Sequence, residues 1–133
     1  MSDVAGQTLV LRPDVVGTVI TDGAVLLDLE TNYFYETNAT GWAILQMFEA
    51  GTTREHVLDQ CRRWGAGATD ADALGKFLET VGADKLIVPS DWPPVTAETS
   101  LEVTWVPPTI QKAPEALQRI MKSAFDPTLP LAE

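Results

Sequence analysis

Short apolar runs separated by turn residues open the chain, a pattern typical of antiparallel β-strands. Residues 15–20 are rich in valine and isoleucine and predict a strand. The Thr-Asp-Gly sequence of residues 21–23 predicts a tight turn into a second strand over residues 24–29. A polar turn at residues 31–32 leads to a third, short strand over residues 33–36. We therefore expect a three-stranded antiparallel sheet that buries one of its faces.

Three stretches with helical periodicity follow, and each is preceded by a capping signal. The first begins at Asn38 or Thr40, whose side chains can accept a bond from a free amide of the first turn, and it ends at Gly51. Residues 52–55 (Thr-Thr-Arg-Glu) form a capping box for the second helix. Residues 69–72 cap the third helix. Three strands followed by three helices predict an α+β domain of winged-helix type.

Two further extended pieces flank this pattern. Residues 8–11 are apolar but are followed by Pro13, which lacks an amide donor, so we expect a turn or an edge strand there. Residues 86–88 form a last extended piece after the third helix. We accordingly place the domain at residues 1–88.

The composition changes after residue 88, where prolines become frequent. We treat residues 89–133 as a C-terminal extension. Residues 101–106 alternate like a strand, and Pro114 suits the first turn of an amphipathic helix. The apolar side of that helix would carry Leu117, Ile120, Met121 and Ala124.

Charge restricts the classes of partner. The 133 residues carry a net charge of −10, with a sequence pI near 4.4, and the few cations are scattered. Such a chain repels nucleic acid and anionic membranes. We see no N-terminal signal peptide, and no apolar run approaches the roughly 20 residues that span a bilayer. We therefore expect a soluble cytoplasmic protein without a membrane or nucleic-acid partner.

The sequence does not bring together groups that would form a catalytic or metal site. His56 is the only histidine, and Cys61, the only cysteine, lies on the apolar face of the second helix, so no nucleophile–base pair is predicted. Metal binding lacks clustered histidines and cysteines. We expect the carboxylates to lie at turns and on a solvent face: Asp22, Asp28, Glu30 and Glu36. We therefore expect no enzyme activity and no cofactor or metal, and we interpret the chain as a binding module.

A winged-helix regulator that binds DNA is one alternative from another class. Its recognition helix would have to present cations and amides to the base edges. The third helix instead carries one cation, Lys76, against three acids, Asp70, Asp72 and Glu79. A generic protein-interaction module is a further alternative.

Residues 23–57 carry a pattern that resembles the PqqD-like family, the recognition domains for ribosomally synthesised and post-translationally modified peptides. The residues that match are Gly23, Val25, Leu26, Leu27, Asp28, Thr31, Tyr33, Asn38, Thr40, Gly41, Ile44, Gly51, Thr52, Thr53, Glu55 and Val57. The resemblance extends more loosely to Val88. The chain departs from the pattern at Thr37, where the family usually has a leucine, and in everything after Pro89.

The resemblance implies a non-catalytic peptide chaperone. Such a protein binds the leader of a precursor peptide and presents it to a modifying enzyme, often a radical SAM protein. The leader would add as a strand along residues 33–37 and lie against the third helix. The third strand ends the meander, so we expect one of its edges to be free. The predicted peptide-binding residues are Tyr33, Phe34, Tyr35, Glu36, Thr37, Leu74, Lys76, Phe77, Leu78 and Val81.

Two features of this prediction have alternatives. Either Tyr33 and Tyr35 face the core, with Phe34 and Glu36 outward, or the reverse. The extension packs on the domain, docks on the modifying enzyme, or occupies the peptide groove of its own chain or of a neighbour through residues 101–106. An exposed strand edge also permits a homodimer by edge pairing.

Overall fold

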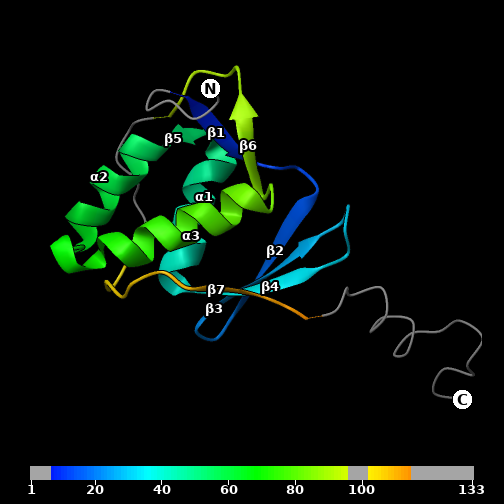
Figure 1. Ribbon diagram of the computed structural model, residues 1–133, viewed down its shortest axis with the longest axis horizontal. Coiled ribbons are helices and arrows are strands. Elements are labelled where there is room, and N and C mark those ends of the chain that lie inside the picture. The colour runs from blue at the N-terminus through cyan, green and yellow to red at the C-terminus, as the bar shows by residue number, and fades with distance from the viewer. Residues whose placement is uncertain (1–6, 96–101, 115–133) are drawn as a thin grey trace, which may run out of the picture.

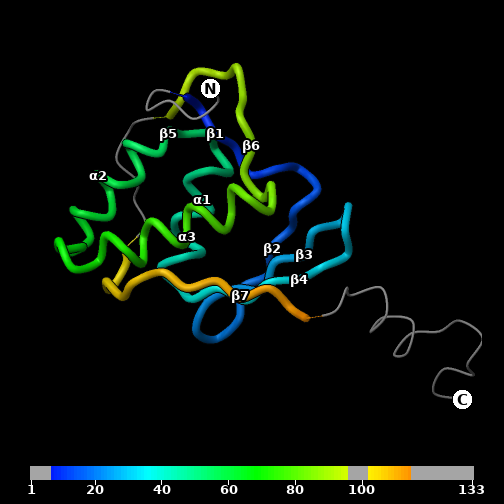
Figure 2. The backbone as a smooth tube through the Cα atoms, in the orientation of Figure 1, coloured from blue at the N-terminus to red at the C-terminus, as the bar shows by residue number. Residues whose placement is uncertain are grey.

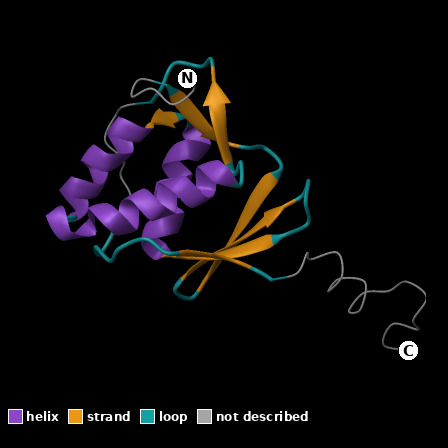
Figure 3. Cartoon of the chain, in the orientation of Figure 1, coloured by secondary structure: helices purple, strands orange, loops and turns teal. Residues whose placement is uncertain are grey.

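The computed structural model describes residues 7–95 and 102–114, which form a mixed α+β fold (Figure 1). The three α-helices lie together, with one small antiparallel sheet above them in this view and the other at their lower right (Figure 3). The α+β class predicted from the sequence is confirmed. The helices are α1 (Ala39–Ala50), α2 (Arg54–Trp64) and α3 (Ala71–Ala83), with a 3-10 turn, η1 (Ala68–Asp70), before α3.

The predicted meander is present. Strands β2 (Val15–Ile20), β3 (Gly23–Asp28) and β4 (Phe34–Asn38) pair in sequence order, with Ile20 opposite Gly23 and Leu27 opposite Phe34. The sheet nevertheless has four strands, because β7 (Ile110–Lys112) pairs with β4. The prediction that one edge of the third strand is free is therefore wrong.

A second sheet was missed by the sequence argument. Its strand order is β5 (Thr52–Thr53), β1 (Thr8–Leu11) and β6 (Ile87–Ser90). The expectation of a turn or edge strand at residues 8–11 is wrong, because β1 is the central strand and Pro13 lies beyond its end. Proline is tolerated within β6 because that strand is itself an edge.

The helix caps follow from side chains at the strand ends. The Asn38 side chain accepts the Gly41 amide at 2.9 Å and so caps α1. Gly51 ends the helix at φ 92°, a conformation that favours glycine. The Thr53 hydroxyl accepts the His56 amide at 3.0 Å and caps α2. The predicted capping box at residues 52–55 is thus half right, since a cap is present but Glu55 lies too early in the helix to reciprocate.

One apolar core joins the sheets to the helices. Leu26 of β3 and Tyr35 of β4 are buried against Ile44 and Phe48 of α1. Cys61 on α2 is fully buried in the same cluster, and burial raises the pKa of its thiol to about 12. Cys61 is therefore a core residue, as its position on the apolar face of the second helix predicts.

Asp28 corrects one prediction about the acidic residues. Its side chain is only 1% exposed, although we expected it at a turn or on the solvent face. It forms a short ion pair with Arg12, and Arg12 also reaches Glu30 at 2.6 Å. The pair fastens the segment between β1 and β2 to the end of β3, and a paired cation is what makes burial of this carboxylate tolerable.

Within the C-terminal extension, residues 102–114 run along the domain as an extended segment (Figure 2). We call residues 102–114 the returning segment. Residues 102–109 have no regular secondary structure, so the strand predicted at residues 101–106 is wrong, and the strand lies later, at β7. The helix predicted after Pro114 lies outside the described residues. Within the described ranges, no helix has the length and apolar content needed to cross a bilayer.

Candidate functional site

Strand β4 has one face in the core and one face outward. Tyr35 and Thr37 are buried, at 1% and 5% exposure, while Glu36 is exposed and Phe34 is half-buried. Tyr33, just before the strand, packs partly against the core. Of the two arrangements that the sequence allows, the structure therefore has the tyrosines inward. This orientation directs the phenol of Tyr35 toward α3.

The outer edge of β4 carries an antiparallel ladder with β7. Tyr35 lies opposite Lys112, Glu36 opposite Gln111 and Thr37 opposite Ile110. The Ala113 amide donates to the Phe34 carbonyl at 2.8 Å and extends the ladder by one rung. This edge therefore pairs with an extended polypeptide through main-chain bonds, which depend little on side-chain identity.

Two polar side chains at the end of β4 supplement the ladder. The Thr37 hydroxyl donates to the Thr109 carbonyl at 2.7 Å. The Asn38 amide group donates to the Pro107 carbonyl at 2.8 Å, and its oxygen accepts the Thr109 amide at 3.1 Å. Asn38 thus holds the returning segment with the same side chain that caps α1.

Trp105 anchors the other end of the returning segment beside the start of α3. Its indole N–H donates to Oδ2 of Asp70 at 2.9 Å, and its ring lies against Gly65. A β-carbon added at Gly65 would lie 3.1 Å from Cβ of Trp105, so this glycine leaves room for the indole. The described segment therefore has an aromatic anchor as well as a strand.

A charged group links β7 to the end of α3. The Tyr35 hydroxyl donates to Oδ2 of Asp84 at 3.0 Å, and Nζ of Lys112 lies 3.8 Å from the same oxygen. Burial, and then the bond to Asp84, raise the pKa of Tyr35 well above its usual range, so it remains a donor. Nζ of Lys112 also lies 4.3 Å from the centre of the Tyr33 ring, a cation–π distance.

The apolar residues predicted on the third helix lie in the core. Leu74, Phe77, Leu78 and Val81 are buried to between 0% and 6% exposure, so they do not form an open wall. The edge of the Phe77 ring nevertheless lies beside Gly41, next to the Thr109 carbonyl of the returning segment. Lys76 is exposed on the same helix. A role for these five residues in peptide binding stays a prediction.

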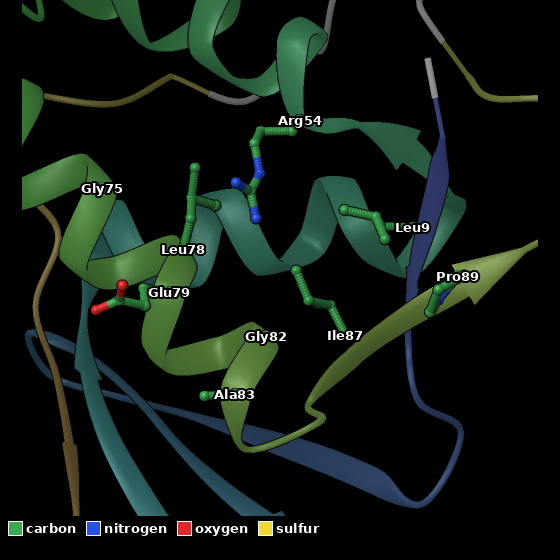
Figure 4. A pocket seen from close by; sticks show the side chains of 9 residues that line it. All are labelled: Leu9, Arg54, Gly75, Leu78, Glu79, Gly82, Ala83, Ile87 and Pro89. Carbon is green, nitrogen blue, oxygen red and sulfur yellow. The ribbon is translucent and has the colours of Figure 1, made fainter. Parts of the chain in front are cut away.

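Two cavities lie on the flank of α3 that faces α2 and β6. One, of about 450 Å³, lies between Leu9, Arg54, Leu78 and Ile87 (Figure 4). The other, of about 530 Å³, extends toward Leu58 and Ala71, and both cavities are lined by Arg54, Gly75 and Leu78. Neither cavity is lined by residues of β4. They are therefore separate from the outer edge of β4.

The only described histidine and cysteine do not lie at the outer edge of β4. Cys61 is buried, and its raised pKa keeps the thiol protonated to high pH. His56 lines a small surface depression on α2 with Glu55 and Asp59. Among the described residues, no group of three or more histidine, cysteine or acidic side chains could hold a metal ion. What the site does contain is a row of main-chain donors and acceptors flanked by Asp70, Asn38 and Asp84.

Sequence reasoning missed several residues of this site. Asn38 was predicted as a helix cap and Asp70 as part of the cap of the third helix, and neither was predicted to bind a peptide. Asp84 gave no signal, since it follows the last periodic residue of α3. Trp105 did give one, because it lies on the alternating apolar face of residues 101–106.

Comparison with known proteins agrees with the sequence pattern. Residues 23–87 match the family model described as Coenzyme PQQ synthesis protein D (PqqD). No curated protein and no solved structure matched the chain. The matched range begins at β3 and ends at the start of β6, so it includes β4, α3 and all the residues predicted to bind peptide. Residues 23–87 of this chain therefore belong to the PqqD family.

Proposed function

We propose that this protein is a non-catalytic adaptor for a ribosomally synthesised precursor peptide. It binds the leader of that peptide as an additional strand along β4 and presents the attached core to a modifying enzyme, such as a radical SAM protein. The family match supports the general role. The single observation that supports the mode of binding is the edge of β4, which pairs with an extended segment in antiparallel register.

The chemistry of this edge suits a peptide leader. Main-chain bonds supply affinity, and side-chain positions beside the ladder supply selectivity. Asp84 favours a cationic residue opposite Tyr35, as Lys112 is in the structure. Asp70 favours a donor at the far end of the segment. The division into a recognition domain at residues 1–88 and an extension at residues 89–133 is part of this proposal.

The surface of α3 supports peptide binding over DNA binding. Asp72 and Glu79 are exposed beside Lys76, so this helix would bring more negative than positive charge to a duplex. A homodimer by edge pairing stays a prediction, and it would use an edge other than that of β4, which β7 covers.

Titration of ¹⁵N-labelled protein with synthetic leader peptides tests the proposal. The peptides are the leaders of candidate precursor sequences, with scrambled peptides of the same composition as controls. We expect amide shifts in β4 and in α3, together with shifts in the returning segment as it is displaced. Saturable shifts confined to other elements, or equal shifts with scrambled peptides, would reject the proposed site.

A further inference from the structure

The returning segment covers the edge that the proposed function assigns to a leader. It does so without contributing a residue to the fully buried apolar core. Trp105 and Ile110 only pack against that core as partly buried side chains. Of residues 102–114, only Pro108 is buried, and it is not part of the core cluster. The segment is therefore an addition to a domain whose core is complete without it.

The returning segment forms a shorter ladder with β4 than the neighbouring strand β3 does. β7 pairs with three residues of β4, whereas β3 pairs with five. Glu102, Thr104 and Val106 are exposed, and residues 107 and 108 are prolines, which have no amide to donate. A segment with few buried apolar contacts and a short ladder opens at a lower free energy than the domain unfolds.

The polar contacts are nonetheless specific. Thr37 and Asn38 bind the carbonyls of Thr109 and Pro107, Asp70 binds the indole of Trp105, and Lys112 lies near Asp84. Figure 1 shows the segment, in yellow and orange, running from the region of α2 and α3 to β4. The two departures from the family pattern, Thr37 and the chain after Pro89, meet in one hydrogen bond.

We propose that the returning segment is an intramolecular competitor: residues 102–114 bind reversibly in the peptide site, and an incoming peptide must displace them. This inference rests on the proposed function for the identity of the incoming peptide. Because the segment belongs to the same chain, its effective concentration at β4 exceeds that of a free peptide. The apparent affinity for any peptide at this edge is then reduced by the fraction of molecules in which the edge is open.

The pattern of the segment also specifies what displaces it. A competing peptide presents an aromatic donor near Asp70, a β-branched residue opposite Thr37 and a cation near Asp84. In the chain these are Trp105, Ile110 and Lys112. The occupant of the site is thus an extended peptide that contains a β-branched residue. An aromatic residue lies five positions before that residue, and a cation lies two positions after it.

A reversible disulfide between β4 and β7 tests this competition in the full chain. Glu36 and Gln111 are exposed and directly opposite each other. Their Cα atoms are expected about 5.5 Å apart, which suits a disulfide. The Glu36→Cys, Gln111→Cys protein is titrated, oxidised and then reduced, with a synthetic peptide of residues 102–114, and a scrambled peptide is the control.

We expect the reduced protein to bind the synthetic peptide and the oxidised protein to bind it about tenfold more weakly or not at all. A second full-length variant, Trp105→Ala with Lys112→Ala, weakens the segment in cis without a crosslink. It should bind the peptide several-fold more tightly than the wild-type protein does. Equal affinity of oxidised and reduced protein, or lack of binding to both the reduced protein and the second variant, would overturn the inference.

The same proteins separate this inference from the proposed function. If the synthetic peptide binds as expected but no leader peptide changes the amide shifts of β4, the intramolecular competition is supported and the proposed function fails. If a leader shifts β4 equally in the oxidised and reduced proteins, the adaptor role stands and the competitor is rejected.

Discussion

The indole N–H of Trp105 donates to Oδ2 of Asp70 at 2.9 Å, across 35 positions of the chain. The same oxygen accepts the Gly67 amide at 2.8 Å and so closes the turn before α3. One carboxylate therefore both shapes the entry to α3 and holds the returning segment.

Replacing Asp70 should loosen the returning segment. Asp70→Ala removes both bonds, and we expect a loss of about 1–2 kcal/mol in the free energy of unfolding. Faster hydrogen exchange at Ala113, whose amide bonds to Phe34, would report the loosening. Asp72→Ala, at an exposed acid two residues further on in the first turn of α3, is the matched control and should leave the exchange at Ala113 unchanged. Unchanged exchange at Ala113 in Asp70→Ala would show that Trp105 is not an anchor.

The Arg12 cluster offers a comparison of buried and exposed carboxylates. Asp28 is 1% exposed and Glu30 has a side chain 65% exposed, yet both pair with Arg12. Asp28→Ala should cost about 3–5 kcal/mol, because it leaves a largely buried cation without its main partner. Glu30→Ala should cost less than about 1 kcal/mol, because solvent screens that pair. Urea denaturation measures both, and equal losses would contradict this assignment.

Two glycines should respond in opposite directions to alanine. Gly75 lies within α3, and a β-carbon there meets nothing within 4 Å, so Gly75→Ala should stabilise the protein by about 0.5–1 kcal/mol. At Gly23 the added carbon would clash with the main-chain oxygen of Thr37. Gly23→Ala should therefore destabilise by about 1–3 kcal/mol. Thermal unfolding of both variants checks the signs, and a stabilised Gly23→Ala would refute the close approach of β3 to β4.

The buried thiol of Cys61 should make the free energy of unfolding depend on pH at high pH. Burial raises its pKa to about 12 in the folded protein, whereas the thiol titrates near about 8.5 in the unfolded chain. The unfolded chain loses its proton first, so the contribution is complete below about pH 8.5 and is lost as the pH rises toward 12.

The expected slope from this one group is about 1.4 kcal/mol per pH unit in that window. The Cys61→Ala variant has no thiol to titrate at this position. The difference in unfolding free energy between wild type and Cys61→Ala should therefore shrink between about pH 9 and pH 11. Parallel pH profiles for the two proteins would contradict a buried, protonated thiol.

Local chemistry in the sequence predicted most of the secondary structure. The turn at residues 21–23 and the alternation on either side of it specify a hairpin, and β2 and β3 pair as expected. Asn38 and Gly51 mark the ends of α1 because their preferences act over a few neighbouring residues. The family pattern was visible for the same reason, since it consists largely of turn and cap residues in order.

Pairing between distant segments was decided only by the tertiary structure. Strand β1 gains its partners β5 and β6 from segments 40 or more residues away, and nothing local in residues 8–11 encodes that choice. The alternation of residues in its strand predicted that Asp28 is exposed. It is buried because it pairs with Arg12, which lies in the connection between β1 and β2. The strand of the returning segment was also decided by long-range pairing. Its alternating residues 101–106 predicted a strand, but the ladder with β4 forms at Ile110–Lys112. Pro107 and Pro108 have no amide to donate, whereas the amides of Ile110–Lys112 are available to pair.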